Sequence, residues 1–411
     1  MINLALLRQE PERIINLLQS KDPHCNIQEL YTSDIKVRSL KQEVEHLRHQ
    51  KNECAQRAKS GLTTDLREQS IFIGKQLKQK EQELTIVEEE FNKLLLACPN
   101  IPDEILPVGG PEHNKVVRII GQKPVWNFEP KNHVELAMNL GWLDFQVAAT
   151  MTASNFALYK KDAVGLLYAL GLFMLKNNKD HGFEPILPPF LVNEESLTVS
   201  GNFPKFKDQA YHIPSDALYL TPTSEVNLVN IYRNTIIPAE QLPICMTALT
   251  SCFRREAGGY GAHERGLIRM HQFEKVELVT ICQPENSKQE LDRMIACAEN
   301  ILKKLNLHYR VSLLATQDTG FQSAKTYDIE VWLPGQKEYR EVSSASTCTD
   351  FQARRGLIRY KPLEIEKPAY VHTLNASSLA IPRLMVALME TYQQEDGTIT
   401  LPEILKSYWV F

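Results

Sequence analysis

Hydrophobic residues in the first hundred positions recur at alternating intervals of three and four. One run comprises Val37, Leu40, Val44, Leu47, Cys54 and Ala58, and a second comprises Ile73, Leu77, Leu84, Val87, Phe91, Leu94 and Cys98. Heptads of this kind are typical of supercoiled helices. The segment between the runs, Lys59–Asp65, is long enough only to reverse the chain, and Thr64 or Asp65 is expected to cap the returning helix. The pattern predicts an antiparallel helical hairpin with helices of about 45–50 Å, at ~1.5 Å per residue.

The chain changes character after Cys98. Prolines at positions 99 and 102 end the second helix, and a stretch rich in proline and glycine extends the break to position 111. We therefore expect three parts: a helical arm at residues 1–102, a linker at 103–120 and a folded domain at 121–411.

Beyond residue 120 the hydrophobic pattern is mixed. It predicts helices at Asp162–Asn177, Pro284–Leu305 and Leu379–Gln394. Strand-like runs occur at Phe183–Leu191, Ala217–Leu220, Ile244–Cys252, Gln272–Thr280, Tyr309–Leu314, Tyr327–Trp332 and Tyr339–Ser343. Because strands often follow one another without an intervening helix, we expect an α+β fold with a mixed, mainly antiparallel β-sheet flanked by helices.

Composition narrows the class of protein. Of the 411 residues, 43% are hydrophobic, which excludes general disorder. No apolar run reaches the ~18–20 residues of a membrane span, and the N-terminus becomes charged too early for a signal peptide. The eight cysteines include no CxxC pair, which argues against a zinc site and against a disulfide scaffold. A reducing, cytoplasmic location is therefore expected.

Charge is uneven within the predicted hairpin. Residues 46–80 hold eight bases against three acids, whereas residues 81–93 hold five acids and one base. Two interpretations remain open from this segment alone. It is either a solvated coiled coil for dimerisation or spacing, or an arm whose basic outer half follows a phosphate backbone.

Candidate nucleotide-binding residues lie on strands, because the chain has neither GxGxxG nor GxxxxGK[ST]. One strand ends at Arg254 and Glu256, a glycine-rich segment follows, and the chain returns through Phe273, Lys275 and Glu277. Alternation places Arg254 and Glu256 on one face of the first strand. It also places Phe273, Lys275 and Glu277 together on one face of the returning strand. An arginine can grip a phosphate, an aromatic ring can stack on a base, and a glutamate can accept from an amino group. A plain strand hairpin with cross-strand ion pairs explains the same residues.

Two later segments add candidate ligands. Glu341 stands three residues before Ser344, and both carry oxygen ligands suited to Mg²⁺ bound with a nucleotide. Arg383 follows Pro382 at the expected start of the last helix, where a positive charge opposes the helix dipole. This placement favours an anionic ligand for Arg383, with an exposed surface arginine as the alternative.

These segments resemble the three motifs of class II aminoacyl-tRNA synthetases. Asp162–Asn177 with the prolines at 188 and 189 resembles motif 1, Arg254–Glu256 with Arg269–Phe273 resembles motif 2, and Leu379–Tyr392 resembles motif 3. The fuller resemblance is to seryl-tRNA synthetases of the bacterial type, which carry an N-terminal coiled-coil arm. It covers essentially the whole chain in collinear order, with the further landmarks Phe203–Phe206, Thr223–Glu225, Glu330–Gln336, Asp350–Arg355 and Tyr392–Gln394.

The resemblance implies ATP-dependent attachment of serine to tRNA(Ser) through a seryl-adenylate, with Mg²⁺ as the metal and tRNA(Sec) as a second candidate acceptor. Catalytic roles fall to Arg254, Glu341 and Arg383, and Mg²⁺ would be held by Glu341 and Ser344. The implied ATP-binding residues are Arg254, Arg255, Glu256, Met270, Phe273, Glu341, Val342, Ser343, Ser344 and Arg383. The implied serine-binding residues are Thr223, Ser224, Glu225, Arg254, Glu277, Asn375 and Ser377, with Glu277 as the partner of the substrate hydroxyl.

The resemblance also implies an assembly and a tRNA-binding surface. Motif 1 implies a homodimer. The arm would lie along the long variable arm of the tRNA and read its backbone shape, which favours the phosphate-binding interpretation of the charge asymmetry. The candidate tRNA contacts are Arg48, Lys51, Arg57, Lys59, Arg67, Lys75 and Lys78.

The chain departs from the family pattern near the implied serine pocket. Ala376 and Ser378 stand where the family commonly has glycines, and their added side chains are candidates to narrow the pocket. Ala345 and Thr347 also differ, as does the motif 2 loop at 262–265. None of these departures removes a charged residue of the implied site.

Two other functions would be expected to leave different residues in the chain. A synthetase paralogue that activates an amino acid for a carrier protein would be expected to lack the basic arm. A non-catalytic tRNA-binding relative would be expected to have lost Arg254, Glu256, Glu341 or Arg383, and all four are present.

Overall fold

The computed structural model describes every residue except 60, 62, 257–265, 363–366 and 410–411. It divides into two compact units, Met1–Pro99 and Asn100–Phe411. The segment 103–120, expected to be a linker, lies within the second unit and contains η1 (Pro111–His113) and β1 (Lys115–Ile120). The reason is that β1 pairs with β11 (Tyr309–Leu313) at the edge of the large sheet.

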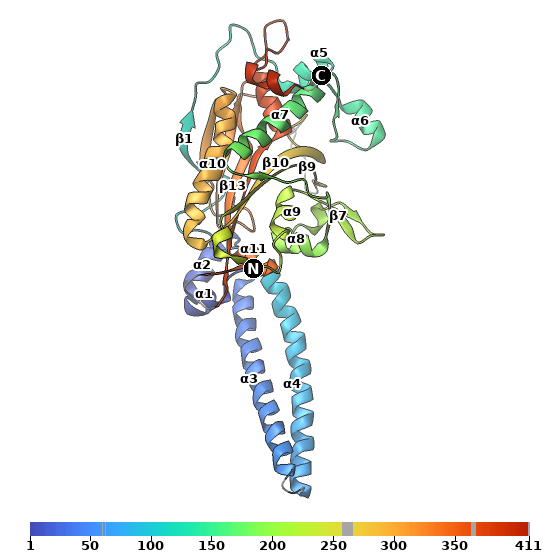
Figure 1. Cartoon of the computed structure of the whole chain (residues 1–411), viewed down its shortest axis with the longest axis vertical. Coiled ribbons are helices and arrows are strands. Elements are labelled where there is room, and N and C mark those ends of the chain that lie inside the picture. Colours follow the sequence, from blue (N-terminus) through green and yellow to red (C-terminus); the bar gives the residue numbers. More distant parts are fainter. Residues whose placement is uncertain (60, 62, 257–265, 363–366, 410–411) are drawn as a thin grey trace. The chain divides into compact units, whose positions relative to one another are not determined.

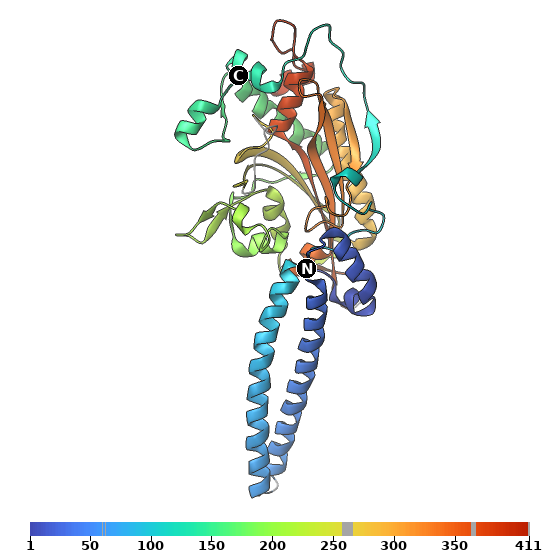
Figure 2. The same ribbon diagram turned by 180° about the vertical axis from the view of Figure 1, so that it is seen from behind.

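The described residues of the first unit form four helices. They are α1 (Leu4–Gln9), α2 (Pro11–Lys21), α3 (Ile27–Ala58) and α4 (Thr64–Ala97). Helices α3 and α4 run side by side as the predicted antiparallel hairpin (Figure 1, Figure 2). Predicted heptad residues such as Val37, Val44 and Leu77 are buried between them. The cap of α4 is Thr63 rather than Thr64 or Asp65, because the Thr63 hydroxyl accepts from the Leu66 amide at 3.3 Å.

The second unit is built on an eight-stranded sheet of order β1-β11-β12-β13-β16-β10-β9-β4. Its other strands are β4 (Glu184–Pro185), β9 (Ile244–Phe253), β10 (Gln272–Cys282), β12 (Lys325–Leu333), β13 (Glu338–Thr349) and β16 (His372–Ala380). Every neighbouring pair is antiparallel except β4 with β9. The expected mixed, mainly antiparallel sheet is confirmed.

Helices cover both faces of this sheet. On one face, α7 (Asp162–Asp180), α10 (Ser287–Lys304) and α12 (Ile381–Thr391) share the main core with the sheet, and Figure 1 shows α7 and α10 across it. On the other face, α8 (Glu194–Ser200), α9 (Ser224–Asn230) and α11 (Phe351–Gly356) pack on a second core with β9 and β10.

Shorter elements complete the unit. Helices α5 (His133–Leu140) and α6 (Phe145–Met151) flank a two-stranded sheet of β2 (Leu143–Asp144) and β3 (Leu158–Tyr159). One small sheet comprises β5 (Leu191–Asn193), β7 (Leu218–Leu220) and β6 (His212–Ile213). Another comprises β15 (Ala369–Tyr370), β14 (Arg359–Lys361) and β8 (Ile236–Pro238). The remaining 3-10 turns are η2 (Lys207–Gln209), η3 (Ala239–Gln241), η4 (Pro284–Asn286) and η5 (Glu403–Tyr408).

Two expected elements differ in the structure. The strand expected at Phe183–Leu191 is interrupted in the structure. Glu184–Pro185 pairs with β9 as β4, and Leu191 begins β5, while the prolines at 188 and 189, which lack a backbone donor, lie between them. The helix expected from Leu379 begins at Ile381, because Leu379 belongs to β16, the central strand that pairs with both β10 and β13. Within the described residues, no helix is both long enough and apolar enough to cross a membrane.

Candidate active site

A cavity of about 420 Å³ opens over the ends of β9, β10, β13 and β16 and the start of α12. It is lined by Arg254, Glu256, Leu267, Ile268, Arg269, Met270, Phe273, Lys275, Arg340, Glu341, Ser377, Ala380, Pro382 and Arg383. Six of the ten residues predicted to bind ATP line this cavity, although they come from three distant parts of the sequence.

The β9–β10 hairpin places a cation beside an aromatic ring. The Arg254 amide donates to the His271 carbonyl at 2.9 Å, which continues the strand pairing beyond Phe253. The Arg254 guanidinium carbon lies 5.2 Å from the centre of the Phe273 ring. A flat ring and a charge are thus held together at this end of the hairpin.

Glu256 is held in an unusual backbone conformation. Its φ is +50°, a left-handed conformation that is uncommon for residues other than glycine. Its carboxylate accepts from Arg269 Nε at 2.6 Å, so an ion pair does connect the two sides of the hairpin. The glycine-rich segment and positions 262–265, singled out in the sequence, lie outside the described residues.

Arg383 and Glu341 form the opposite wall of the cavity. Arg383 Nη1 donates to Glu341 Oε2 at 2.7 Å and to the Glu341 carbonyl at 2.9 Å. Desolvation of the Glu341 carboxylate opposes its ionisation, but Arg383, helped by Arg254 and Lys275, outweighs this and holds the pKa of Glu341 below its ordinary value. The cavity therefore presents a charged carboxylate among several cations.

Four predicted ATP ligands do not line the cavity. Arg255 is exposed, and the Val342 side chain is 1% exposed within the main core. Ser343 donates its hydroxyl to the Ser377 carbonyl, and Ser344 lies opposite Asp328 across β12 and β13. Their roles in ATP binding stay predictions, and Val342 can act only through its backbone.

A second cluster of polar residues is buried behind Lys275. The Thr223 hydroxyl caps α9 and donates to Glu277 Oε2 at 3.2 Å, while Lys275 Nζ donates to the same hydroxyl at 2.9 Å. Lys275 also forms an ion pair with Glu277. The ion pair joins residues of one strand rather than two, in contrast to the cross-strand alternative considered from the sequence.

Glu225 lies in the same region on α9. One of its oxygens accepts from Gln352 Nε2 at 2.7 Å and from Asn375 Nδ2 at 2.9 Å. Burial, followed by the nearby charge of Glu277, raises the pKa of Glu225 to about 7. This carboxyl group is therefore ready to accept or lose a proton near neutral pH, which is typical of functional sites.

The remaining predicted serine ligands lie between the cavity and the buried cluster around Glu225 and Glu277. Ser377 lines the cavity and lies on the same strand as Asn375, two positions along β16. Ser224 is fully buried at the start of α9, and its hydroxyl has no hydrogen-bond partner among the residues described. The structure thus brings the predicted serine-binding residues to one place beside the cavity.

The family departures on β16 point away from this pocket. Ala376 is buried in the main core beneath the sheet, and the Ser378 hydroxyl donates to Asn178 of α7 at 2.9 Å. Thr347 contacts Ser287 of α10 at 3.1 Å. The side chains of Ala376 and Ser378 on β16 and of Thr347 on β13 do not narrow the predicted serine pocket, because alternation along each strand sends them to the opposite face.

Sequence reasoning assigned no role to several residues of the site, although it named some of them. Lys275, Arg269 and Arg340 line the cavity, and Gln352 holds Glu225. The alternation of Lys275 with Phe273 and Glu277 was a usable signal. The contact from Gln352 spans 127 residues, and no local pattern in the sequence announces it.

The candidate tRNA contacts are all exposed on α3, α4 and the residues between them. They are Arg48, Lys51, Arg57, Lys59, Arg67, Lys75 and Lys78. Arg48 is engaged by Glu81 of the neighbouring helix at 2.7 Å. Exposure leaves these side chains accessible to a large anionic partner.

The antiparallel sheet and its cavity, with Arg254 and Arg383 on facing walls, define the catalytic core of a class II aminoacyl-tRNA synthetase. Residues 206–392 match the family model of the tRNA synthetase class II core domain (G, H, P, S and T), and residues 1–102 match that of the seryl-tRNA synthetase N-terminal domain. The serine--tRNA ligase of Syntrophobacter fumaroxidans is 44% identical over 416 residues, covering 99% of this chain and 98% of the relative. The chain belongs to the seryl-tRNA synthetase family.

Further relatives agree over the full length. The serine--tRNA ligase of Campylobacter fetus is 44% identical over 418 residues, and the match covers 99% of this chain and 100% of the relative. The crystal structure of seryl-tRNA synthetase from Pyrococcus horikoshii complexed with ATP has a TM-score of 0.94 and 35% identity, covering 100% of this chain and 98% of that one. The crystal structure of cytoplasmic serine-tRNA ligase from Naegleria fowleri in complex with AMP has a TM-score of 0.88 and 26% identity, and the match covers 99% of this chain and 96% of that one.

Proposed function

We propose that this chain attaches serine to tRNA(Ser) in two steps. ATP and serine first form seryl-adenylate with release of pyrophosphate, and the seryl group is then transferred to the 3′-terminal adenosine of the tRNA. The observation that carries the proposal is the junction at Lys275 and Ser377, where the ATP-sized cavity meets the buried pocket of Glu225 and Glu277. The carboxylate of serine and the α-phosphate of ATP can meet there.

The cavity is suited to ATP in a defined orientation. Phe273 offers a face for adenine, with Glu256 and the Met270 backbone as its hydrogen-bond partners. Arg254 lies between the two clusters, where it can hold the α-phosphate and the serine carboxylate, and Arg383 can hold the γ-phosphate. The chemistry is positioning and charge stabilisation, and it requires no covalent enzyme intermediate.

The buried pocket is suited to serine. Glu225, once ionised, can accept hydrogen bonds from the α-ammonium group. Glu277 is engaged by Thr223 and Lys275 through Oε2, so Oε1 can accept from the serine hydroxyl. Alanine and glycine would leave this acceptor unpaired, and threonine must be rejected by size.

The residues around Glu341 fit a divalent cation. Glu341 and Ser344 offer oxygen ligands, and the neighbouring Asp328 has a buried Oδ1 with no hydrogen-bond partner in the described part of the chain. Glu341 lines the cavity, Ser344 and Asp328 lie next to it on the paired strands, and such hard oxygen donors suit Mg²⁺. When bound, Mg²⁺ would neutralise charge on the ATP phosphates.

The arm supplies the proposed tRNA surface. Its exposed basic residues can follow the phosphate backbone of tRNA(Ser) without reading bases. A cytoplasmic homodimer is part of the proposal, as the motif 1 resemblance implies. tRNA(Sec) is the second candidate acceptor, and charging assays with both transcripts distinguish them.

The direct test is serine-dependent ATP–pyrophosphate exchange by the full chain. Exchange is expected with serine and Mg²⁺, with rates for threonine, alanine and glycine lower by at least about tenfold. Omitting Mg²⁺ should abolish exchange. Equal exchange with threonine would contradict serine specificity, and no exchange with any of the four amino acids would overturn the proposed activity.

A further inference from the structure

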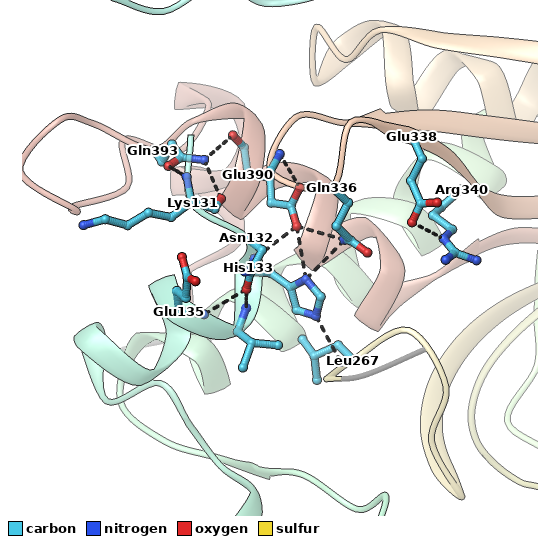
Figure 3. A network of polar contacts seen from close by, with 12 residues as sticks. Lys131, Asn132, His133, Glu135, Leu267, Gln336, Glu338, Arg340, Glu390 and Gln393 are labelled. Carbon is cyan, nitrogen blue, oxygen red and sulfur yellow. Dashed lines mark hydrogen bonds and ion pairs between the residues drawn. The ribbon is translucent and has the colours of Figure 1, made fainter. Parts of the chain in front are cut away.

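A buried polar network lies beside the ATP cavity, centred on Glu390 of α12 (Figure 3). Its Oε1 accepts from His133 N at 3.0 Å, from His133 Nδ1 at 3.1 Å and from Gln336 Nε2 at 3.0 Å. Its Oε2 accepts from the Gly335 amide at 2.9 Å. Both His133 and Glu390 are buried, at 3% and 0% exposure. Four donors converge on one carboxylate, which acts only as an acceptor.

The network determines the tautomer of His133. The Leu267 amide donates to His133 Nε2 at 3.3 Å, and a backbone N–H can only donate. Nε2 must therefore be unprotonated, so the proton of the neutral ring sits on Nδ1, where Glu390 accepts it. The two contacts support each other, because the carboxylate fixes the tautomer that Leu267 requires.

The Leu267 contact reaches the ATP cavity directly. Leu267 and Ile268 line the cavity, and the Ile268 carbonyl accepts from Arg383 Nε at 3.2 Å. The chain also approaches His133 very closely at Gly266, whose φ is +73° and where a Cβ would lie 2.3 Å from His133 Nε2. His133 itself does not line the cavity.

We propose that His133 is a positioning residue for ATP. Its ring, oriented by Glu390, holds Leu267 and Ile268 in place as the cavity wall and thereby sets the orientation of Arg383. The inference rests on ATP binding in this cavity, which is part of the proposed function. Because the serine pocket is formed by α9, β10 and β16, the effect falls on ATP and leaves serine affinity unchanged.

Two substitutions at His133 separate this role from general stability. In His133→Gln the amide oxygen lies near the place of Nε2 and can still accept from Leu267. In His133→Asn the amide nitrogen lies near the place of Nδ1, so the Glu390 contact is kept and the Leu267 contact is lost. We expect His133→Asn to weaken ATP binding about fivefold, and His133→Gln to stay within about twofold of the wild type.

The measurement is calorimetric titration of the full-length protein with ATP and Mg²⁺, and separately with serine, together with the Tm of each variant. Gly266→Ala disturbs the contact from the other side, because its Cβ would lie 2.3 Å from His133 Nε2 and push the ring and the backbone at Leu267 apart, and it should also weaken ATP binding. Equal loss of ATP affinity in His133→Asn and His133→Gln would overturn the proposal. So would parallel losses of ATP and serine affinity that follow Tm.

Failure of the proposed function would be visible separately. Serine-dependent exchange by the wild type is measured in parallel, and its absence would contradict the function. The ATP affinities of the variants decide the role of His133 in either case, because they do not depend on turnover.

Discussion

The Glu225 carboxyl group gives the site a measurable dependence on pH. Its pKa of about 7 exceeds the ordinary value of 4.5, so the folded protein binds this proton more tightly than the unfolded chain does. The contribution of Glu225 to stability is therefore present at low pH and is lost as pH rises from about 4.5 to about 7. Glu225→Gln removes this dependence. We expect the Tm of Glu225→Gln, relative to wild type, to increase between pH 5 and pH 8, as measured by calorimetry at each pH.

A second Glu→Gln variant tests whether the pH dependence comes from the titration of the Glu225 carboxyl group. Glu194 is an exposed glutamate at the start of α8, and its pKa is lowered by Lys207 rather than raised. Glu194→Gln should not reproduce the rising difference. A Tm difference for Glu225→Gln that is constant from pH 5 to pH 8 would contradict the elevated pKa.

At the residue scale, the sequence revealed side chains whose placement is unusual for their type. Arg254 beside a glycine-rich segment and Arg383 at a helix start were recognisable, and both line the cavity. His133 was not recognisable, and Gln352 appeared only within the landmark Asp350–Arg355, because the importance of both comes from contacts with residues more than a hundred positions away. Such contacts depend on the tertiary fold, and no local spacing encodes them.

At the element scale, alternation along β16 separates selectivity from stability. Asn375 donates to Glu225 in the proposed serine pocket, whereas the adjacent Ala376 faces the core. We expect Ala376→Gly to destabilise the fold by about 1 kcal/mol, because it adds backbone freedom and removes a buried methyl group. It should leave the KM for serine and the preference for serine over threonine unchanged, as measured by pyrophosphate exchange and thermal unfolding.

The neighbouring substitution on the other face is the control. Asn375→Ala removes a donor to Glu225 and should raise the KM for serine about fivefold. If Ala376→Gly instead allowed threonine to be activated, the side chain at 376 would shape the pocket, contrary to its position in the core.

Long elements were predictable and short or central ones were not. The heptads of α3 and α4 and the strands β9, β10, β11 and β12 follow their patterns closely, since one periodicity runs through each. The strand β16 was not predicted from the sequence. It is paired on both sides and both of its faces are covered, so its residues show no simple alternation of polar and apolar side chains. The two-residue strand β4 is defined by its partner β9 alone.

At the scale of the whole molecule, the chain has two units with separate cores, and the proposed chemistry divides between them. In the proposed function, adenylate formation requires only the second unit, whereas tRNA charging also requires the basic surface of the arm. We expect Lys51→Ala combined with Lys75→Ala to raise the KM for tRNA(Ser) and to reduce the slope of log affinity against log salt by about 2. ATP–pyrophosphate exchange should be unchanged.

The control removes the same amount of positive charge from α3 and α4, but outside residues 46–80, which hold the excess of basic residues. Lys36 of α3 and Lys93 of α4 are exposed and lie outside residues 46–80. Lys36→Ala with Lys93→Ala should leave both the KM for tRNA and its salt dependence close to wild type, because the local charge near the tip is intact. If both double variants raised the KM equally, net charge rather than a defined tRNA surface would explain the effect. If neither did, the hairpin would serve as a spacer or a dimerisation element, the alternative that its periodicity alone left open.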